Sequence, residues 1–202
     1  MSKNIEKIIY INLEKRKDRK EEIESELNKF ELQYERFNAI ERKMGLVGCG
    51  YSHLEVLKKA KKMNYKNVLI LEDDFVFLVS KEEFENNLTD FFNTIKHFDV
   101  CMLSYNVLQN ELVVGINVVK RLLEAQTASG YIVNNHYYDK LIELYEKNIP
   151  ILEQTGIHWI YANDQIWKPL QKQDKWYYFT TRIGRQRPGY SDNAECITDV
   201  GC

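Results

Sequence analysis

The chain has 202 residues, of which 44% are apolar and 29% are charged, a composition typical of globular proteins. This length allows one domain with a sizeable core but would cramp two, so we expect one domain over residues 1–202. A formal net charge of -2 gives no basic excess to indicate nucleic acid as the main partner. No apolar run approaches the ~20 residues of a membrane span, and the N-terminus lacks the apolar core of a signal peptide, so we expect a cytoplasmic protein.

Strand-like and helix-like segments alternate along the chain. In chain order we predict strand 7–13, helix 14–30, strand 34–38, helix 52–63, strand 68–71, helix 81–95, strand 99–104, strand 130–134, helix 136–148, helix 160–170 and strand 176–180. Such alternation is typical of βαβ units. The predicted fold class is therefore α/β, with a mostly parallel central sheet and helices on both faces.

Local signals set several of these boundaries. Ile23, Leu27 and Phe30 share one face of the first predicted helix. Three glycines between residues 45 and 50 predict a flexible stretch before the second helix. Pro150 is expected to stop the helix that begins near residue 136, because proline removes a backbone donor.

The strand at residues 68–71 leads directly into three carboxylates, Glu72, Asp73 and Asp74. They fall at the carboxyl end of a strand, the edge at which open α/β sheets bind ligands. Adjacent carboxylates repel one another unless a positive group lies between them. A divalent cation such as magnesium or manganese would supply that charge, since hard metals favour carboxylate ligands. The alternative is a solvated acidic turn that ends a strand.

Five segments, in order and with suitable spacing, extend over most of the chain. They are Tyr10-Ile11-Asn12-Leu13 with Arg16, Asp18 and Arg19; Gly48-Cys49-Gly50-Tyr51-Ser52-His53-Leu54; Leu71-Glu72-Asp73-Asp74; Ser129-Gly130-Tyr131; and Asp164-Gln165. Together they resemble glycosyltransferase family 25, which holds lipopolysaccharide-biosynthesis glycosyltransferases and procollagen galactosyltransferases. Gly189-Tyr190-Ser191-Asp192 is a weaker sixth segment.

The resemblance implies a Rossmann-like nucleotide-sugar transferase fold of the GT-A type, with a metal-binding acidic motif after a central strand. Asp74 would be a direct metal ligand, with Asp73 the second candidate. Asp73 or Glu72 would otherwise bind the ribose or the water shell of the metal. For Glu72 the alternative is a helix or loop cap.

Two arginines follow the first strand at the same edge of the sheet. In the functional interpretation Arg16 or Arg19 binds the nucleotide diphosphate, because the planar guanidinium suits phosphate, and backbone groups of Asn12 or Leu13 touch the base. The alternative is a solvated helix face in which Asp18 pairs with a neighbour.

Ser52 and His53 open the second predicted helix. Ser52 would serve as its N-cap, and the glycine-rich approach would let backbone amides meet an anion there. His53 is a candidate donor-site residue or a structural histidine. A nucleophilic Ser-His pair is disfavoured, because sequence neighbours at a helix start cannot easily form the required hydrogen bond.

Asp164 lies in an aromatic-rich helical segment with Trp159 and Trp167. Aromatic neighbours would raise the pKa of its carboxyl, as a general base requires, and would stack on sugar rings. The alternative places the aromatics in the core and Asp164 on the wet face. Asp192 is a weaker candidate for the same site.

The four cysteines contain no CxxC pair. Cys101 lies in an apolar run and is expected to be buried. Cys196 and Cys202 are close enough in sequence to pair, although free thiols are the simpler interpretation.

The predicted function is a metal-dependent, inverting transfer of a hexose from a nucleotide sugar, with uridine diphosphate as the expected carrier. The acceptor would be a hydroxyl of a glycan or protein. One alternative is a non-catalytic nucleotide- or carbohydrate-binding module of the same fold. Another is a nucleotidyltransferase, which would use the same carboxylates on an attacking phosphate.

Overall fold

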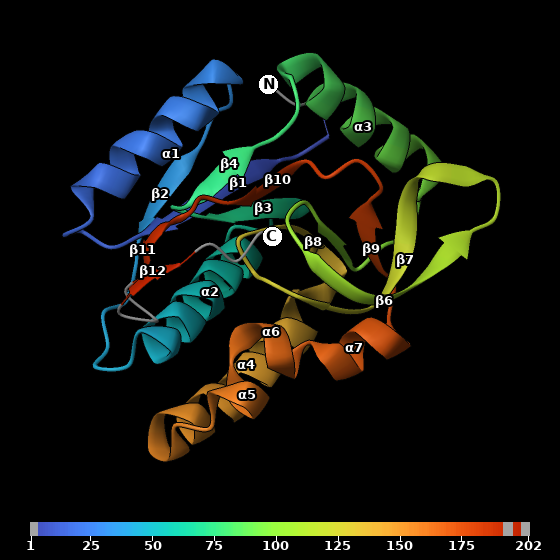
Figure 1. Ribbon diagram of the computed structural model, residues 1–202. Coiled ribbons are helices and arrows are strands. Elements are labelled where there is room, and N and C mark those ends of the chain that lie inside the picture. The colour runs from blue at the N-terminus through green and yellow to red at the C-terminus, as the bar shows by residue number, and fades with distance from the viewer. Residues whose placement is uncertain (1–3, 192–195, 199–202) are drawn as a thin grey trace.

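A computed structural model describes residues 4–191 and 196–198 (Figure 1). Among them, eight strands form the central sheet, in the order β2 (Glu35–Asn38), β1 (Lys7–Asn12), β3 (Asn67–Glu72), β8 (Gly130–Asn134), β5 (Val100–Met102), β9 (Trp176–Phe179), β7 (Ile116–Gln126) and β6 (Asn106–Val113). β8 and β7 pair antiparallel with both neighbours, so they run against the other six strands. The sheet is therefore mostly parallel, as predicted.

Helices cover both faces of this sheet (Figure 1). The helices are α1 (Lys17–Lys29), α2 (Gly45–Lys62), α3 (Lys81–Thr94), the 3-10 turn η1 (Asn135–Tyr137), α4 (Tyr138–Thr155), α5 (His158–Tyr161), α6 (Asn163–Ile166) and α7 (Lys168–Gln173). In β1, Ile9 packs into the core beneath α2 and α4, whereas Ile8 packs into the core beneath α1 and α3. This alternation follows from the two-residue period of a strand, and it confirms the predicted two-sided arrangement.

The predicted apolar face of α1 is buried, since Ile23, Leu27 and Phe30 all lie in the core. Cys101 is fully buried, as predicted. Among the residues that the structure describes, no helix combines the length and apolar character needed to cross a bilayer. Cys202 and Asp192 lie outside the described residues, as does the side chain of Cys196, so the predicted Cys196–Cys202 pairing falls there too.

The glycine-rich stretch is helical, which corrects the prediction of a flexible segment. α2 begins at Gly45, and Ser52 lies inside the helix rather than at its N-cap. The buried Ser52 hydroxyl donates to the Gly48 carbonyl at 2.7 Å and accepts from the Ile40 amide at 2.8 Å. A Cβ atom on Gly48 would overlap the Ile40 carbonyl oxygen. The missing side chain of Gly48 therefore allows α2 to pack closely against the preceding loop. From the sequence alone, these glycines indicated a flexible segment instead.

Gly48→Ala is expected to destabilise the protein by about 1–3 kcal/mol, because the new methyl group meets backbone that cannot move independently. Gly50→Ala is the matched control in the same helix. Its Cβ would lie 3.1 Å from the Ile149 side chain, which can adjust, and alanine gains about 1 kcal/mol of helix propensity. Urea unfolding of both variants checks the prediction, and equal midpoints would contradict it.

Pro150 does not stop its helix, contrary to the prediction. α4 continues through Pro150 and ends at Gly156, whose positive φ of 70° suits glycine. The missing amide of an interior proline costs about 3 kcal/mol. Ile149 and Leu152 on either side of Pro150 are buried in the core between α4 and the sheet. Burial of these side chains therefore offsets the cost of the lost hydrogen bond.

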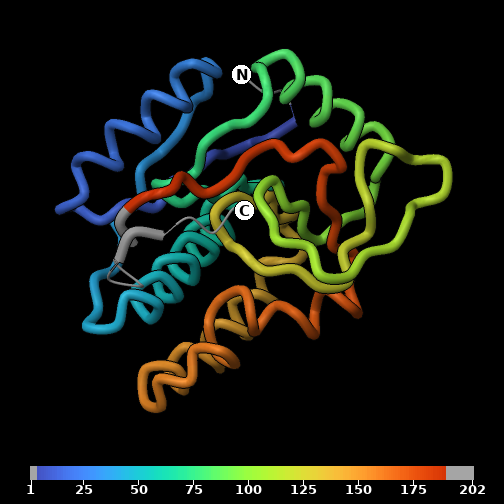
Figure 2. Tube along the Cα trace, in the orientation of Figure 1, coloured from blue at the N-terminus to red at the C-terminus, as the bar shows by residue number. Residues whose placement is uncertain are grey.

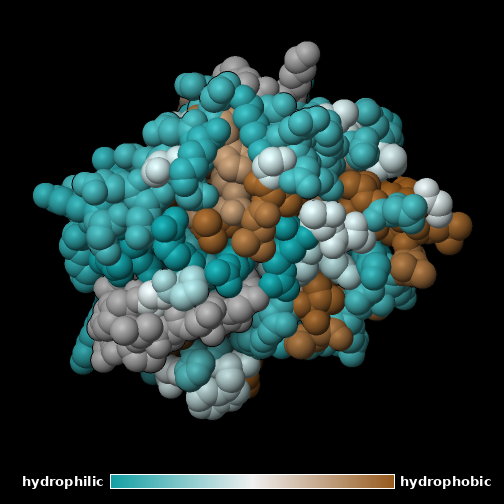
Figure 3. Space-filling view, turned by 45° about the horizontal axis from the view of Figure 1, so that its top comes forward, coloured by the Kyte–Doolittle hydropathy of each residue, from teal (hydrophilic) through white to brown (hydrophobic). Residues whose placement is uncertain are grey.

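Several strands were absent from the prediction. β6 and β7 form a hairpin at the sheet edge, with exposed apolar side chains at Leu108, Leu112 and Val114. Figure 3 shows hydrophobic surface gathered over this projecting hairpin. β4 (Phe75–Phe77) pairs with β10 (Gly184–Gln186), so the C-terminal segment runs beside β4 (Figure 2). β11 (Gly189–Ser191) pairs with β12 (Cys196–Thr198). The predicted helix over residues 160–170 is divided among α5, α6 and α7.

Candidate active site

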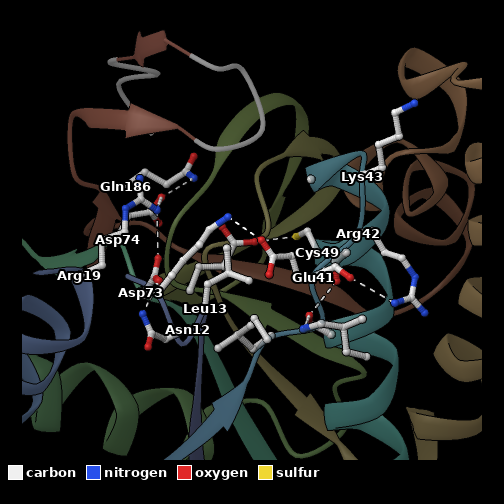
Figure 4. A pocket seen from close by; sticks show the side chains of 18 residues that line it. Asn12, Leu13, Arg19, Glu41, Arg42, Lys43, Cys49, Asp73, Asp74 and Gln186 are labelled. Atoms are coloured by element: carbon white, nitrogen blue, oxygen red, sulfur yellow. Dashed lines mark hydrogen bonds and ion pairs between the residues drawn. The ribbon is translucent and has the colours of Figure 1, made fainter. Parts of the chain in front are cut away.

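A pocket of about 460 Å³ opens at the carboxyl ends of β1 and β3, beside the first turns of α2. Its lining residues are Ile11, Asn12, Leu13, Lys15, Arg19, Ala39, Ile40, Glu41, Arg42, Lys43, Gly45, Gly48, Cys49, Ser52, Glu72, Asp73, Asp74 and Gln186. Figure 4 shows Asp73, Asp74 and Gln186 on one side and Cys49 with Arg42 on the other. The structure therefore brings together most of the predicted donor-site residues at the predicted sheet edge.

Arg19 is the cation that faces the acidic turn. Its Nη1 lies 3.0 Å from Asp73 Oδ1 and 3.2 Å from Asp74 Oδ2, and all three side chains are largely buried. Asp73 also accepts a hydrogen bond of 2.7 Å from Asn12 Nδ2. Burial raises the pKa of Asp73, with Asn12 and Arg19 acting in the opposite direction. Asn12 is in turn held by Arg36, whose Nε donates to Asn12 Oδ1 at 3.0 Å.

Asp74 is the least satisfied of the carboxylates. Its Oδ1 is buried and has no hydrogen-bond partner among the described residues, while Gln186 Nε2 approaches Oδ2 at 3.5 Å. Burial and the negative charges of Glu72 and Asp73 raise the pKa of Asp74 to about 7, although Arg19 opposes them. The turn therefore holds more negative charge than its neighbours neutralise.

Phe75, the buried residue that follows Asp74, fixes the position of the acidic turn. Its ring occupies the space where Gly130 and Gly184 would carry side chains, so neither glycine can be replaced without moving that ring. The Arg187 amide donates to the Asp74 carbonyl at 2.6 Å, and the Glu72 amide donates to the Ser129 carbonyl at 2.9 Å. The Ser129-Gly130-Tyr131 segment of β8 thus supports the turn in two ways. The Ser129 carbonyl accepts a hydrogen bond from Glu72, and Gly130 leaves room for the Phe75 ring.

His53 and Glu72 form a second cluster, at the inner wall of the pocket. His53 Nε2 lies 3.1 Å from Glu72 Oε1, and Cys49 Sγ donates to the same oxygen at 3.3 Å. Burial raises the pKa of Glu72, but these contacts with His53 and Cys49 outweigh it, so the net pKa is lowered. His53 is fully buried, and its Nδ1 lies 2.7 Å from Tyr131 Oη.

The two predicted arginines differ in position. Arg16 lies beside Asp18, with its Nη2 2.7 Å from Asp18 Oδ2, so Asp18 pairs with a neighbour as the alternative foresaw. The Asp18 side chain is exposed, whereas that of Arg16 is largely buried. Among the described residues that line the pocket, Arg19 is present and Arg16 is absent. Leu13 lines the pocket beside Asn12, and the predicted contact of their backbone groups with a base stays a prediction.

Asp164 lies in the first turn of α6. Its Oδ2 accepts from the Thr127 amide at 3.3 Å, and it is absent from the described residues that line the pocket. The pKa of the Cys49 thiol is raised mainly by burial and by the charge of Glu72, and the negative charge of Asp164 makes a smaller contribution in the same direction. Ile166 and Trp167 are buried, whereas Trp159 is 65% exposed. The aromatic segment is therefore shared between core and surface.

Sequence reasoning missed several pocket residues. Lys15, Arg42 and Lys43 add positive charge at the rim, and Gln186 arrives from the C-terminal segment. Arg42 and Lys43 precede α2, so a correct helix start would have placed them at a helix N-terminus. For Gln186 the sequence carries no signal, because its place depends on the pairing of β10 with β4.

Solved structures share this fold. The glycosyltransferase GlyE of Streptococcus pneumoniae TIGR4 aligns with a TM-score of 0.52 and 12% identity, over 88% of this chain and 45% of that one. A197 from STIV aligns with a TM-score of 0.50 and 13% identity, over 95% of this chain and 92% of that one. At such identities the likeness concerns the fold, and it confirms the predicted glycosyltransferase fold of the GT-A type.

A family model matches part of the sequence. The model of glycosyltransferase family 25 (LPS biosynthesis protein) matches residues 43–122, which contain α2 and the acidic turn. This match confirms the resemblance to family 25 and the prediction of a glycosyltransferase. A comparison with curated proteins found no match.

Proposed function

We propose that this enzyme transfers a hexose from a nucleotide sugar, with uridine diphosphate as carrier, to a hydroxyl of a glycan or protein, with inversion. The observation that carries the proposal is the charge of the acidic turn. Glu72, Asp73 and Asp74 bring three carboxylates to the pocket, and Arg19 is the cation paired with two of them. One further divalent cation would balance this charge.

The acidic turn fits manganese or magnesium. Asp74 Oδ1 is a buried carboxylate oxygen without a hydrogen-bond partner among the described residues, and Glu72 offers its carboxylate to the same pocket. Both are hard oxygen ligands of the kind these ions prefer. Asp73 is engaged on both oxygens by Asn12 and Arg19, so we propose Asp74 as the principal ligand. When bound, the ion would neutralise charge on the diphosphate as it leaves.

The chain's own residues would orient the donor. Asn12 and Leu13 at the end of β1 line the side of the pocket proposed for the nucleoside. Arg19 would contact the diphosphate while it stays paired with the aspartates, because a guanidinium has five N–H donors. Lys15 and Arg42 at the rim increase the local concentration of an anionic donor.

Asp164 is the proposed general base. In an inverting transfer the acceptor oxygen forms a bond to the anomeric carbon while the bond from that carbon to the diphosphate oxygen breaks. The acceptor hydroxyl proton passes to the Asp164 carboxylate. The exposed Trp159, one helical segment before Asp164, provides a surface on which an acceptor sugar can stack.

Arg19→Ala is expected to raise the dissociation constant of uridine diphosphate about tenfold, the loss of one charge-assisted hydrogen bond. It should also lower stability by about 3 kcal/mol, because the aspartates lose a largely buried partner. Arg16→Ala is the matched control, since Arg16 is absent from the described residues that line the pocket and pairs with the exposed Asp18. Calorimetric titration checks both variants, and uridine without phosphates should bind them like the wild type. Equal diphosphate binding by both variants would remove Arg19 from the donor site.

The proposal is tested by thermal unfolding with a panel of nucleotide sugars and nucleoside diphosphates, with and without manganese. A ligand at one hundred times its dissociation constant stabilises by about 2.7 kcal/mol. We expect this effect for a uridine nucleotide and manganese together and little for either alone. Stabilisation by the nucleotide that a chelator leaves unchanged would count against the acidic turn. Release of nucleoside diphosphate rather than pyrophosphate then separates glycosyl transfer from nucleotidyl transfer.

A further inference from the structure

Two side chains of softer ligand chemistry, Cys49 and His53, converge with the carboxylate of Glu72 at the inner wall of the pocket. Cys49 and His53 lie one helical turn apart on α2, and Glu72 ends β3. Cys49 Sγ is 3.3 Å and His53 Nε2 is 3.1 Å from Glu72 Oε1, and the three ligand atoms lie within 4.8 Å of one another. A tetrahedral zinc ion lies about 2.3 Å from sulfur and about 2.0–2.2 Å from nitrogen or oxygen, so its ligands are roughly 3.3–3.5 Å apart. The two separations measured from Glu72 Oε1, 3.3 Å and 3.1 Å, are close to this spacing.

The groups behind these side chains suit metal binding. Tyr131 Oη is 2.7 Å from His53 Nδ1 and can accept its N–H, which leaves the lone pair of Nε2 directed toward Glu72 and Cys49. The buried Asn163 donates from Nδ2 to Cys49 Sγ at 3.2 Å. A donor on the sulfur stabilises the thiolate that a metal requires. Each of these two ligands therefore has an orienting partner of its own.

We propose that Cys49, His53 and Glu72 bind a thiophilic divalent cation, with zinc the best match. A thiolate and an imidazole select zinc over magnesium and manganese, so this position differs in chemistry from the hard-cation position at Asp74. On binding, the Cys49 thiol releases its proton to solvent and sulfur forms the metal bond. Cys49 and Glu72 line the pocket, so the fourth coordination position faces it.

The test uses the metal alone, without nucleotide, so its outcome is independent of the proposed transfer reaction. The purified protein is stripped with a chelator, loaded with zinc or cobalt(II), and passed through a desalting column. We expect one zinc per chain by elemental analysis. The cobalt form should show a sulfur-to-cobalt charge-transfer band in the near ultraviolet and the visible absorption of a tetrahedral site.

Matched variants assign the ligands. Cys49→Ser should lose the charge-transfer band and the bound zinc, whereas Cys101→Ser, at a buried thiol in the core beneath α1 and α3, should keep both. Tyr131→Phe should weaken zinc binding roughly tenfold by removing the orienting hydroxyl. Circular dichroism confirms that each variant is folded. Wild-type protein without retained zinc and without the cobalt band would overturn the proposal, and so would an unchanged band in Cys49→Ser. In that case the three side chains serve as a hydrogen-bonded support for Glu72.

Discussion

Asp74→Asn is expected to abolish the joint stabilisation by manganese and uridine diphosphate, a loss of about 2.7 kcal/mol at ligand concentrations one hundred times the dissociation constant. The amide nitrogen cannot ligate a cation, and the substitution removes the buried oxygen without a hydrogen-bond partner on which the proposed position depends. Without ligands, the variant should be at least as stable as the wild type, because repulsion with Glu72 and Asp73 is relieved. Thermal unfolding with each ligand alone and with both measures the effect.

Asp18→Asn is the control for this substitution. Asp18 is an exposed carboxylate paired with Arg16, so the charge change is the same but lies away from the pocket. This variant should respond to the ligands like the wild type. If Asp74→Asn also responds like the wild type, Asp74 is no ligand and the hard-cation position must be abandoned.

Asp164→Asn should lower turnover about a hundredfold or more, the usual scale of general-base loss, and leave manganese-dependent nucleotide binding intact. The asparagine oxygen can still accept the Thr127 amide, so the structural contact of Asp164 persists while proton acceptance is lost. Steady-state rates of nucleoside diphosphate release in the presence of acceptor measure the change.

Asp139→Asn provides the matched control for the base, because Asp139 is 65% exposed on its side chain and pairs with Lys61 on the outside of α2. Near-normal turnover of Asp164→Asn would show that Asp164 only anchors Thr127, and His53 and Asp192 would become the next candidates. Loss of nucleotide binding would instead place Asp164 among donor-site or structural residues.

The sequence predicted the acidic turn well because its signal is local. Four buried apolar residues followed directly by carboxylates define both the strand β3 and the edge at which it ends. The same holds for β1 and for the buried face of α1. The pairing of Arg19 with Asp73 and Asp74 has no such signal, because it joins residues more than fifty positions apart. Only the folded chain shows which arginine meets the carboxylates.

The missed elements were those in which tertiary contacts override local preference. β7 contains Arg121-Leu122-Leu123-Glu124-Ala125-Gln126, residues that favour helices, yet it is a strand because it pairs with β6 and β9. The glycines of α2 indicate flexibility when they are considered locally. In the folded chain, the backbone of the preceding loop lies so close to Gly48 that a side chain there would not fit. Pro150 signals a helix end, whereas burial on both sides of it continues the helix.

The packing of the Phe75 ring against Gly130 and Gly184 has a thermodynamic consequence for the neighbouring carboxylates. Because the ring fixes the turn during folding, the entropy of holding Asp74 in place is lost at that stage and not when a ligand arrives. The site is thus preorganised, and a larger share of each ligand contact appears as affinity. Changes in packing around Phe75 would then be felt as weaker binding, although no ligand touches that ring.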